Sequence, residues 1–322
     1  MKHFCKTLLA SVALFAAMAP AHAQADYPKM PIKLVVGFAP GGGTDILARM
    51  ISIPLAQRLG QPVTVDNKAG ASGTIANMAV KNAPADGYTL LIGASGAMTI
   101  NPAVQSDLPY HPVKDFDPIT VIGTYPIVFS TKLDLPVQNT RELIAKAKAT
   151  PGGLNAGGAG VLFQLTGELL NQQAGISTTY VAYRGTAPAV TAILGGEIDL
   201  LIADIAPSLP LIESKRIRPI AITSAQRSKN LPDVPTLAES GLPGFDVDVF
   251  VGLFARKGTP RPIVERLQRE IAEIVASEEI QQKMEKMGIR PSGITPQQTA
   301  ALVQRDLAKY TEAARRGNIK VD

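Results

Sequence analysis

The sequence is poor in the side chains that most often carry metal, thiol and acid–base chemistry. Its 322 residues include one cysteine, three histidines and no tryptophan. Cys5, His3 and His22 lie in an N-terminal segment that we expect to be cleaved, which leaves His111 as the single histidine of the mature chain. The composition therefore excludes a disulfide framework, a thiolate metal site and a histidine cluster, and we expect no metal and no cofactor.

Residues 1–25 are typical of a secretory signal peptide. Lys2 and Lys6 give it a positive start, and the apolar stretch that follows is shorter than the ~20 residues needed to span a bilayer. Two overlapping frames of small residues, "AHA" and "AQA", place the cleavage site near Ala23 or Ala25. We therefore expect a periplasmic protein.

The charge of the chain is mildly basic. Loss of Lys2 and Lys6, with no acidic residue lost, lowers the formal net charge from +5 to +3. The densest basic cluster, Lys215–Arg218, contains no interleaved aromatic residue, so it is typical of a solvated face rather than of a nucleic-acid site. The mild net positive charge favours a small anionic ligand, and the distribution of basic residues favours no nucleic-acid partner.

Short apolar strands alternate with helical patterns along most of the chain, which predicts an α/β fold with mostly parallel sheets. The expected strands are 32–39, 61–68, 88–95, 177–183, 198–203 and 218–224. The expected helices are 44–59, 73–83, 140–149, 165–175 and 187–196.

The C-terminal part is predicted to be helical. Pro260 begins an amphipathic stretch that Gly288 ends, with one apolar stripe along it. Thr295 and Gln298 have the spacing of a capping box at the start of a last helix.

Three segments rich in small residues follow or precede these elements: "GFAPGGGTD" (37–45), "GASGAM" (93–98) and "NAGGAGVLFQL" (155–165). Strand-to-helix loops at the carboxyl ends of parallel strands are the usual place for a ligand. Glycine-rich helix starts offer free N–H groups to an anion. We therefore expect the first and third segments to face each other across an anion-binding cleft.

None of these loops has a catalytic signature. The first lacks the lysine of a P-loop and departs from the dinucleotide-binding pattern. The second resembles a nucleophile elbow but has Ala97 where glycine is required, and its only base would be His111 in a proline-flanked turn. An enzyme is therefore disfavoured.

Several stretches match, in order, the sequence blocks of one known family: 27–49, 83–93, 101–103, 107–119, 194–210, 222–245 and 252–260. In these stretches the chain resembles the Bug family, the periplasmic solute receptors of tripartite tricarboxylate transporters. The resemblance implies a two-domain, type II periplasmic-binding-protein ("Venus flytrap") fold. Domain 1 would combine 25–124 with 248–322, domain 2 would be 125–247, and the ligand cleft would lie between them.

The resemblance also implies which residues contact the ligand. From domain 1 these are Phe38, Ala39, Pro40, Gly41, Gly42, Thr44, Ala94 and Ser95. From domain 2 and the second crossing these are Gly158, Ala159, Gly160, Val161, Leu162, Tyr183, Arg184, Asp204 and Phe250. Structural roles stay open for several of them, namely a surface ion pair for Arg184, a helix cap for Asp204 and a core position for Phe250.

One departure from the family pattern bears on the ligand. Val161 and Leu162 stand where hydroxyl residues are usual, and Gln164 stands where histidine is usual. A second full charge would find few polar partners there. We therefore expect a monocarboxylate with an apolar or aromatic portion to bind better than citrate. The alternative is a distal carboxylate seated on free N–H groups at Gly158–Gly160.

The resemblance favours an extracytoplasmic receptor that captures a small organic carboxylate and delivers it to the membrane permease subunits of a tripartite transporter. It would be a monomer. A periplasmic ligand sensor for a signalling system is the alternative, since it would use the same trap, and a secreted α/β enzyme ranks third.

Overall fold

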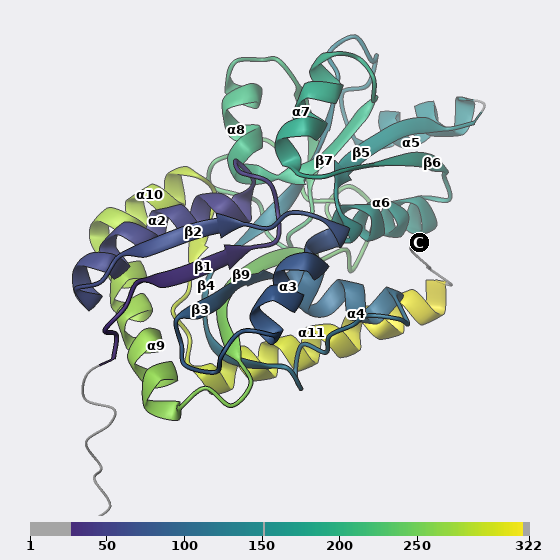
Figure 1. The fold of residues 1–322 in the computed structure, drawn as a ribbon. Coiled ribbons are helices and arrows are strands. Elements are labelled where there is room, and N and C mark those ends of the chain that lie inside the picture. Colours follow the sequence, from purple (N-terminus) through teal and green to yellow (C-terminus); the bar gives the residue numbers. More distant parts are fainter. Residues whose placement is uncertain (1–26, 151, 318–322) are drawn as a thin grey trace, which may run out of the picture.

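A computed structural model of the chain describes residues 27–150 and 152–317. The predicted signal peptide lies outside the described residues. Ten strands in this part of the chain are connected by hydrogen bonds and divide into two sheets that share the long strand β4, Phe116–Thr131. Figure 1 shows helices around each sheet, with residues 32–104 and 248–317 in one part of the molecule and residues 140–213 in the other.

The first sheet has the order β2-β1-β3-β9-β4, with β10 on the other side of β4. Its further strands are β1 (Ile32–Val36), β2 (Val63–Asn67), β3 (Thr89–Ala94), β9 (Asp248–Arg256) and β10 (Arg290–Pro291). β1 pairs in parallel with β2 and β3, as strand–helix–strand units require. Every antiparallel pair in the described sheets includes β4 or β9.

The second sheet has the order β4-β7-β5-β6, with β8 on the other side of β4. Its further strands are β5 (Leu154–Ala159), β6 (Thr178–Tyr183), β7 (Leu200–Asp204) and β8 (Arg218–Ile222). β5 pairs in parallel with β6 and β7.

Strand β4 passes from one sheet to the other without a break. Its residues from Phe116 to Pro126 pair with β9, and those from Ile127 to Thr131 pair with β7. The two sheets combine parallel strand–helix–strand units with antiparallel pairs at β4 and β9, so the α/β class that the sequence predicts is confirmed.

Helices cover both faces of the two sheets. The larger ones are α2 (Gly43–Leu59), α3 (Thr74–Lys81), α5 (Thr140–Ala149), α6 (Val161–Ala174), α7 (Thr186–Leu194), α8 (Ile205–Glu213), α9 (Arg261–Ala276), α10 (Glu278–Lys286) and α11 (Pro296–Gly317). Short turns of helix occur as η1 (Ala71–Gly73), η2 (Gly96–Ile100) and α4 (Asn101–Val104).

Successive side chains of β1 point to opposite faces of the first sheet. Leu34 and Val36 pack into the core that includes Leu267 of α9, whereas Val35 packs on the other face with Val303 of α11. The first sheet is therefore buried on both faces, which explains its nearly continuous apolar strands.

Two sequence predictions about helices have different outcomes. The capping box is confirmed, because Thr295 Oγ1 accepts from Gln298 N–H (3.2 Å) and Gln298 Oε1 accepts from Thr295 N–H (2.9 Å). The expectation of one continuous helix up to Gly288 is wrong. Ser277 has an extended backbone (ψ 140°) and separates α9 from α10.

The segment 155–160 was expected to be a loop, but most of it is the inner strand β5. A Cβ on Gly157 would lie 2.7 Å from Ile198 Cδ1, and one on Gly158 would lie 2.6 Å from the Ile202 carbonyl oxygen. These glycines therefore allow close packing of a central strand. The following helix begins at Val161, earlier than expected.

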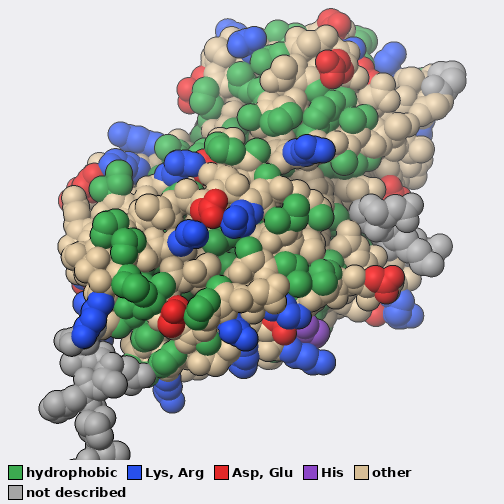
Figure 2. Space-filling model, in the orientation of Figure 1, with side chains coloured by type: hydrophobic (Ala, Val, Ile, Leu, Met, Phe, Trp, Pro, Cys, Tyr) green, Lys and Arg blue, Asp and Glu red, His purple; other side chains and the backbone are tan. Residues whose placement is uncertain are grey.

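Two surface properties accord with the composition. On the face shown in Figure 2, Lys and Arg side chains are intermixed with Asp and Glu and form no large area of one sign. Among the described residues, no helix combines the length and the apolar character that a membrane span needs.

Candidate functional site

A small cavity, partly open to solvent, lies where the two sheets meet. Its lining comprises Phe38, Gly42, Gly43, Thr44, Ser72, Ala94, Gly96, Asn101, Tyr125, Ala159, Val161, Leu162, Phe163, Thr186, Asp204 and Val249. Four helices start at these residues: α2 at Gly43, α6 at Val161, α7 at Thr186, and α8 directly after Asp204. The first N–H groups of a helix have no acceptor within it, so each of these starts brings such donors to the cavity lining, where the Gly43 N–H is already bonded to Asp204 Oδ2.

The glycine loop before α2 is held by a buried carboxylate. Asp45 is 2% exposed and accepts hydrogen bonds from the N–H of Gly41 (3.0 Å), from Arg49 Nε (3.0 Å) and from Asn67 Nδ2 (2.9 Å). These bonds hold the pKa of Asp45 below its ordinary value despite burial. Asp45 does not line the cavity, so it shapes the loop rather than facing a ligand.

Gly43 permits a close approach between the two sheets. Its N–H donates to Asp204 Oδ2 at 2.9 Å. A Cβ at this position would lie 2.5 Å from the Tyr125 hydroxyl oxygen and 3.0 Å from Asp204 Oδ2. Only glycine fits this contact between β4, β7 and the start of α2.

Asp204 is a buried carboxyl group beside the cavity. Its side chain does not cap α8, although the residue precedes that helix. Burial raises its pKa to about 6, against the lowering effect of bonds from Gly43 N–H and from the hydroxyls of Tyr125 and Thr186. Burial together with this carboxylate also raises the pKa of Tyr125.

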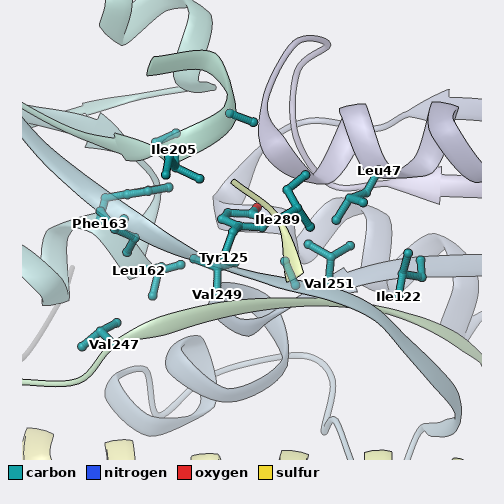
Figure 3. Close-up of a cluster of buried hydrophobic side chains, with 14 of the residues drawn as sticks. Leu47, Ile122, Tyr125, Leu162, Phe163, Ile205, Val247, Val249, Val251 and Ile289 are labelled. Atoms are coloured by element: carbon teal, nitrogen blue, oxygen red, sulfur yellow. The ribbon is translucent and has the colours of Figure 1, made fainter. Parts of the chain in front are cut away.

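The wall opposite α2 is apolar. Val161, Leu162 and Phe163 of the first turn of α6 are each about nine-tenths or more buried and line the cavity. Figure 3 shows Leu162 and Phe163 near Tyr125 and Val249, in the cluster that connects the two sheets. This wall offers side-chain contact but no side-chain hydrogen bond.

The structure brings part of the predicted ligand set to this cavity. The residues that line it are Phe38, Gly42, Thr44, Ala94, Ala159, Val161, Leu162 and Asp204. The residues that do not line it are Ala39, Pro40, Gly41, Ser95, Gly158, Gly160, Tyr183, Arg184 and Phe250. The ligand contacts of all of them stay predictions.

The residues outside the lining differ in burial and position. Ser95 and Phe250 are buried in the first sheet, where Ser95 Oγ accepts from the Phe250 N–H at 2.8 Å and Phe250 packs in the core with Val35 and Phe254. Pro40, Gly41 and Arg184 are exposed at the rim.

Ala39, Gly160 and Tyr183 occupy the edges of the cavity region. A Cβ on Gly185 would lie 2.9 Å from Ala39 Cβ, so the first loop touches the turn after Tyr183. Gly160 has φ +81°, which favours glycine, and its carbonyl accepts from Tyr180 Oη at 3.2 Å.

The sequence prediction missed several lining residues: Gly43, Ser72, Gly96, Asn101, Tyr125, Phe163, Thr186 and Val249. Thr186 carried a usable signal, because it is a hydroxyl residue at a strand-to-helix turn. Tyr125 lies inside a strand that the periodicity did not reveal, so its place depends on the register of β4 with β7 and β9.

The lining contains no Lys, Arg or His. Among the described residues, no group of three or more His, Cys, Asp or Glu side chains is arranged to hold a metal ion. Charge complementarity in the cavity therefore depends on helix starts and hydroxyls.

Comparison with known proteins points to one family. The family model of the tripartite tricarboxylate transporter family receptor matches residues 47–318. Protein BugT of Bordetella pertussis is 35% identical over 322 residues, which cover 98% of each chain.

Two solved structures extend the similarity to the fold. An R. palustris protein with adipate is 35% identical, has a TM-score of 0.89 and covers 92% of this chain and 99% of its own. MatC of Rhodopseudomonas palustris, with bound malate, is 31% identical, has a TM-score of 0.85 and covers 89% of this chain and 99% of its own.

Gly42→Val should remove binding without unfolding the protein. Gly42 has an ordinary extended conformation (φ −83°, ψ 165°), and a Cβ there would lie 3.6 Å from Thr186 Oγ1 and 3.9 Å from Asp204 Oδ2. The valine methyl groups would fill the space beside the first N–H groups of α2. We expect calorimetric affinity for acids such as adipate or benzoate to fall at least about tenfold, ~1.4 kcal/mol, with little change in melting temperature.

Gly60→Ala, at the other end of the same helix, is the matched control. Gly60 has φ +67°, and a Cβ at this position would meet no atom within 4 Å, so alanine should cost about 1 kcal/mol of stability and leave affinity unchanged. Wild-type affinity in Gly42→Val would show that this glycine only serves the turn.

Asp204→Asn should change how stability depends on pH. The folded state keeps the Asp204 proton up to about pH 6, whereas the unfolded chain releases it near 3.8, so this group lowers the free energy of unfolding as pH rises through that window. Between pH 4.5 and pH 7, wild type should lose about 1 to 3 kcal/mol relative to the variant in urea unfolding.

Asp115→Asn provides the control for this measurement. The His111 N–H and Lys81 lower the pKa of Asp115 against the effect of burial, so Asp115 affects the pH dependence of stability only below about pH 4. The difference in free energy of unfolding between Asp115→Asn and wild type should therefore stay nearly constant from pH 4.5 to pH 7. An equally constant difference for Asp204→Asn would contradict the assignment.

Proposed function

The chain belongs to the tripartite tricarboxylate transporter receptor family, and from this membership and the geometry of the cavity we propose that it captures a small organic carboxylate for a membrane transporter. The observation that carries the proposal is the convergence of four helix starts on one cavity without a lysine, arginine or histidine in its lining. Such an arrangement suits an anion that must be held and released.

The energies are sufficient for reversible capture. Each helix start contributes ~0.3–1 kcal/mol to a nearby negative charge, and each hydrogen bond to a charged acceptor adds ~1.5–3 kcal/mol. Micromolar affinity needs about −8 kcal/mol. A few N–H groups and hydroxyls, together with apolar contact, therefore suffice.

Two similar proteins support a carboxylate as the ligand class, because one was solved with adipate and the other with bound malate. Both compounds carry carboxylates. The finer choice for this chain comes from its own lining.

The lining favours a single seated charge and an apolar body. A second carboxylate would face the apolar first turn of α6 or the buried Asp204, with no lining cation to compensate it. An apolar or aromatic body against Val161, Leu162 and Phe163 would instead gain ~25 cal/mol per Å² of buried area. The proposed ligand is a carboxylate with an apolar or aromatic portion.

The proposed cleft lies between two domains, 25–124 with 248–322 and 125–247. Two features support this division: β4 changes partners between Pro126 and Ile127, and β9 begins at Asp248, paired with Pro126. The two connections would form the hinge.

The proposed setting is the periplasm, with the protein acting as a monomer and as a receptor rather than an enzyme. The partner would be the permease subunits of a tripartite transporter. Family membership supports these proposals.

Calorimetric titration of benzoate, terephthalate, adipate and citrate tests the ligand class. We expect benzoate or another acid with an apolar body to bind at least tenfold more tightly than citrate, because citrate brings further charges to a cavity without cations. Tightest binding by citrate would contradict the proposal.

Deletion of the gene separates transport from sensing. Loss of uptake of the tightest-binding radiolabelled acid, with the permease genes still transcribed, is the expected result. Normal uptake with an altered transcriptional response would favour the sensor.

A further inference from the structure

One residue of the cavity lining carries a buried polar atom that has no hydrogen-bond partner in the described part of the chain. Asn101 is 0% exposed and lines the cavity at the first position of α4. Its Nδ2 donates to the Ser72 carbonyl at 3.0 Å and to Tyr110 Oη at 3.4 Å. Its Oδ1 makes no hydrogen bond.

The orientation of this amide is determined by its neighbours. The Ser72 carbonyl can only accept, so the amide nitrogen must face it. Tyr110 Oη already donates to the Ala97 carbonyl at 2.6 Å and therefore accepts from Asn101. The amide oxygen is left as the free acceptor.

Asn101 differs from the other residues with unpartnered buried atoms. Asn77, Ser130, Thr131, Thr140 and Asp248 also carry such an atom, but none of them lines the cavity. An unmet buried acceptor costs about as much as a lost hydrogen bond. A ligand that donates to Asn101 Oδ1 removes this cost, and a ligand without a donor leaves it in place.

We propose that Asn101 determines specificity by requiring a hydrogen-bond donor on the body of the ligand, so that the bound compound is a hydroxy-, amino- or amido-substituted carboxylate. The inference rests on the proposed carboxylate-binding function. A carboxylate at this position offers only acceptors, so it would face Asn101 Oδ1 with a repulsive contact.

The test compares benzoate with its 2-, 3- and 4-hydroxy isomers, and hexanoate with 6-hydroxyhexanoate, by calorimetry on the mature protein. At least one hydroxylated acid should bind tenfold or more tightly than its parent. In Asn101→Leu this preference should fall below threefold, because the hydroxylated acid alone loses affinity.

Tyr110→Phe is the matched control, since it perturbs the same amide through Nδ2 and leaves Oδ1 in place. It should keep the preference of the wild type. Asn101→Ala replaces the leucine variant if circular dichroism shows that the latter does not fold.

The outcomes separate the two proposals. If the acids bind but no hydroxylated form is preferred, or if the preference survives in the Asn101 variant, the role of Asn101 is wrong and the carboxylate function stands. If none of these acids and none of adipate, terephthalate and citrate binds, the proposed function is wrong and this inference is wrong with it.

Discussion

The contact between Gly43 and Asp204 is the constraint on which the rest of the site depends. It joins residues 161 positions apart and connects the start of α2 to the end of β7. It needs a glycine at 43 because Tyr125 and Asp204 leave no room for a Cβ. It also needs β4 in its observed register, because Ile127 pairs with Asp204 while Tyr125 pairs with Val249 of β9. This hydrogen bond can therefore form only when both sheets are correctly assembled.

Burial of the Asp204 carboxylate in this contact has an electrostatic cost, which bears on the kinds of polar groups found around the cavity. Asp204 is buried without a cation, and the N–H and hydroxyl groups around it only partly offset its desolvation. A lysine or arginine at this position would stabilise the carboxylate but would also bind a ligand's charge strongly. Hydroxyls and N–H groups at helix starts instead give moderate attraction, which suits a protein that must release what it binds.

How much the sequence could predict depended on the range of the interactions involved. The helix 44–59, the capping box at Thr295 and the glycine loop follow from local patterns, and the matched blocks identified the family. The strand β5 was expected to be a loop because Gly157 and Gly158 indicate flexibility locally, whereas in the fold they allow the packing of Ile198 and Ile202. The places of Tyr125 and Asn101 depend on contacts between segments far apart in the sequence, which periodicity does not contain.

The departure at Val161 and Leu162 has a meaning that only the structure supplies. Both side chains belong to the first turn of α6, so the start of this helix lines the cavity with apolar side chains. The cavity therefore has donors at the helix starts, acceptors at Asp204 and Asn101, and an apolar wall between elements of the two sheets. Under the proposed function, such a distribution would select ligands through the groups that stay unpaired: an extra charge would meet hydrocarbon or another acceptor, and a missing donor would leave an amide oxygen buried. Selectivity of this kind would cost little binding energy for the correct ligand and would disfavour polyanions without a repulsive side chain of like charge.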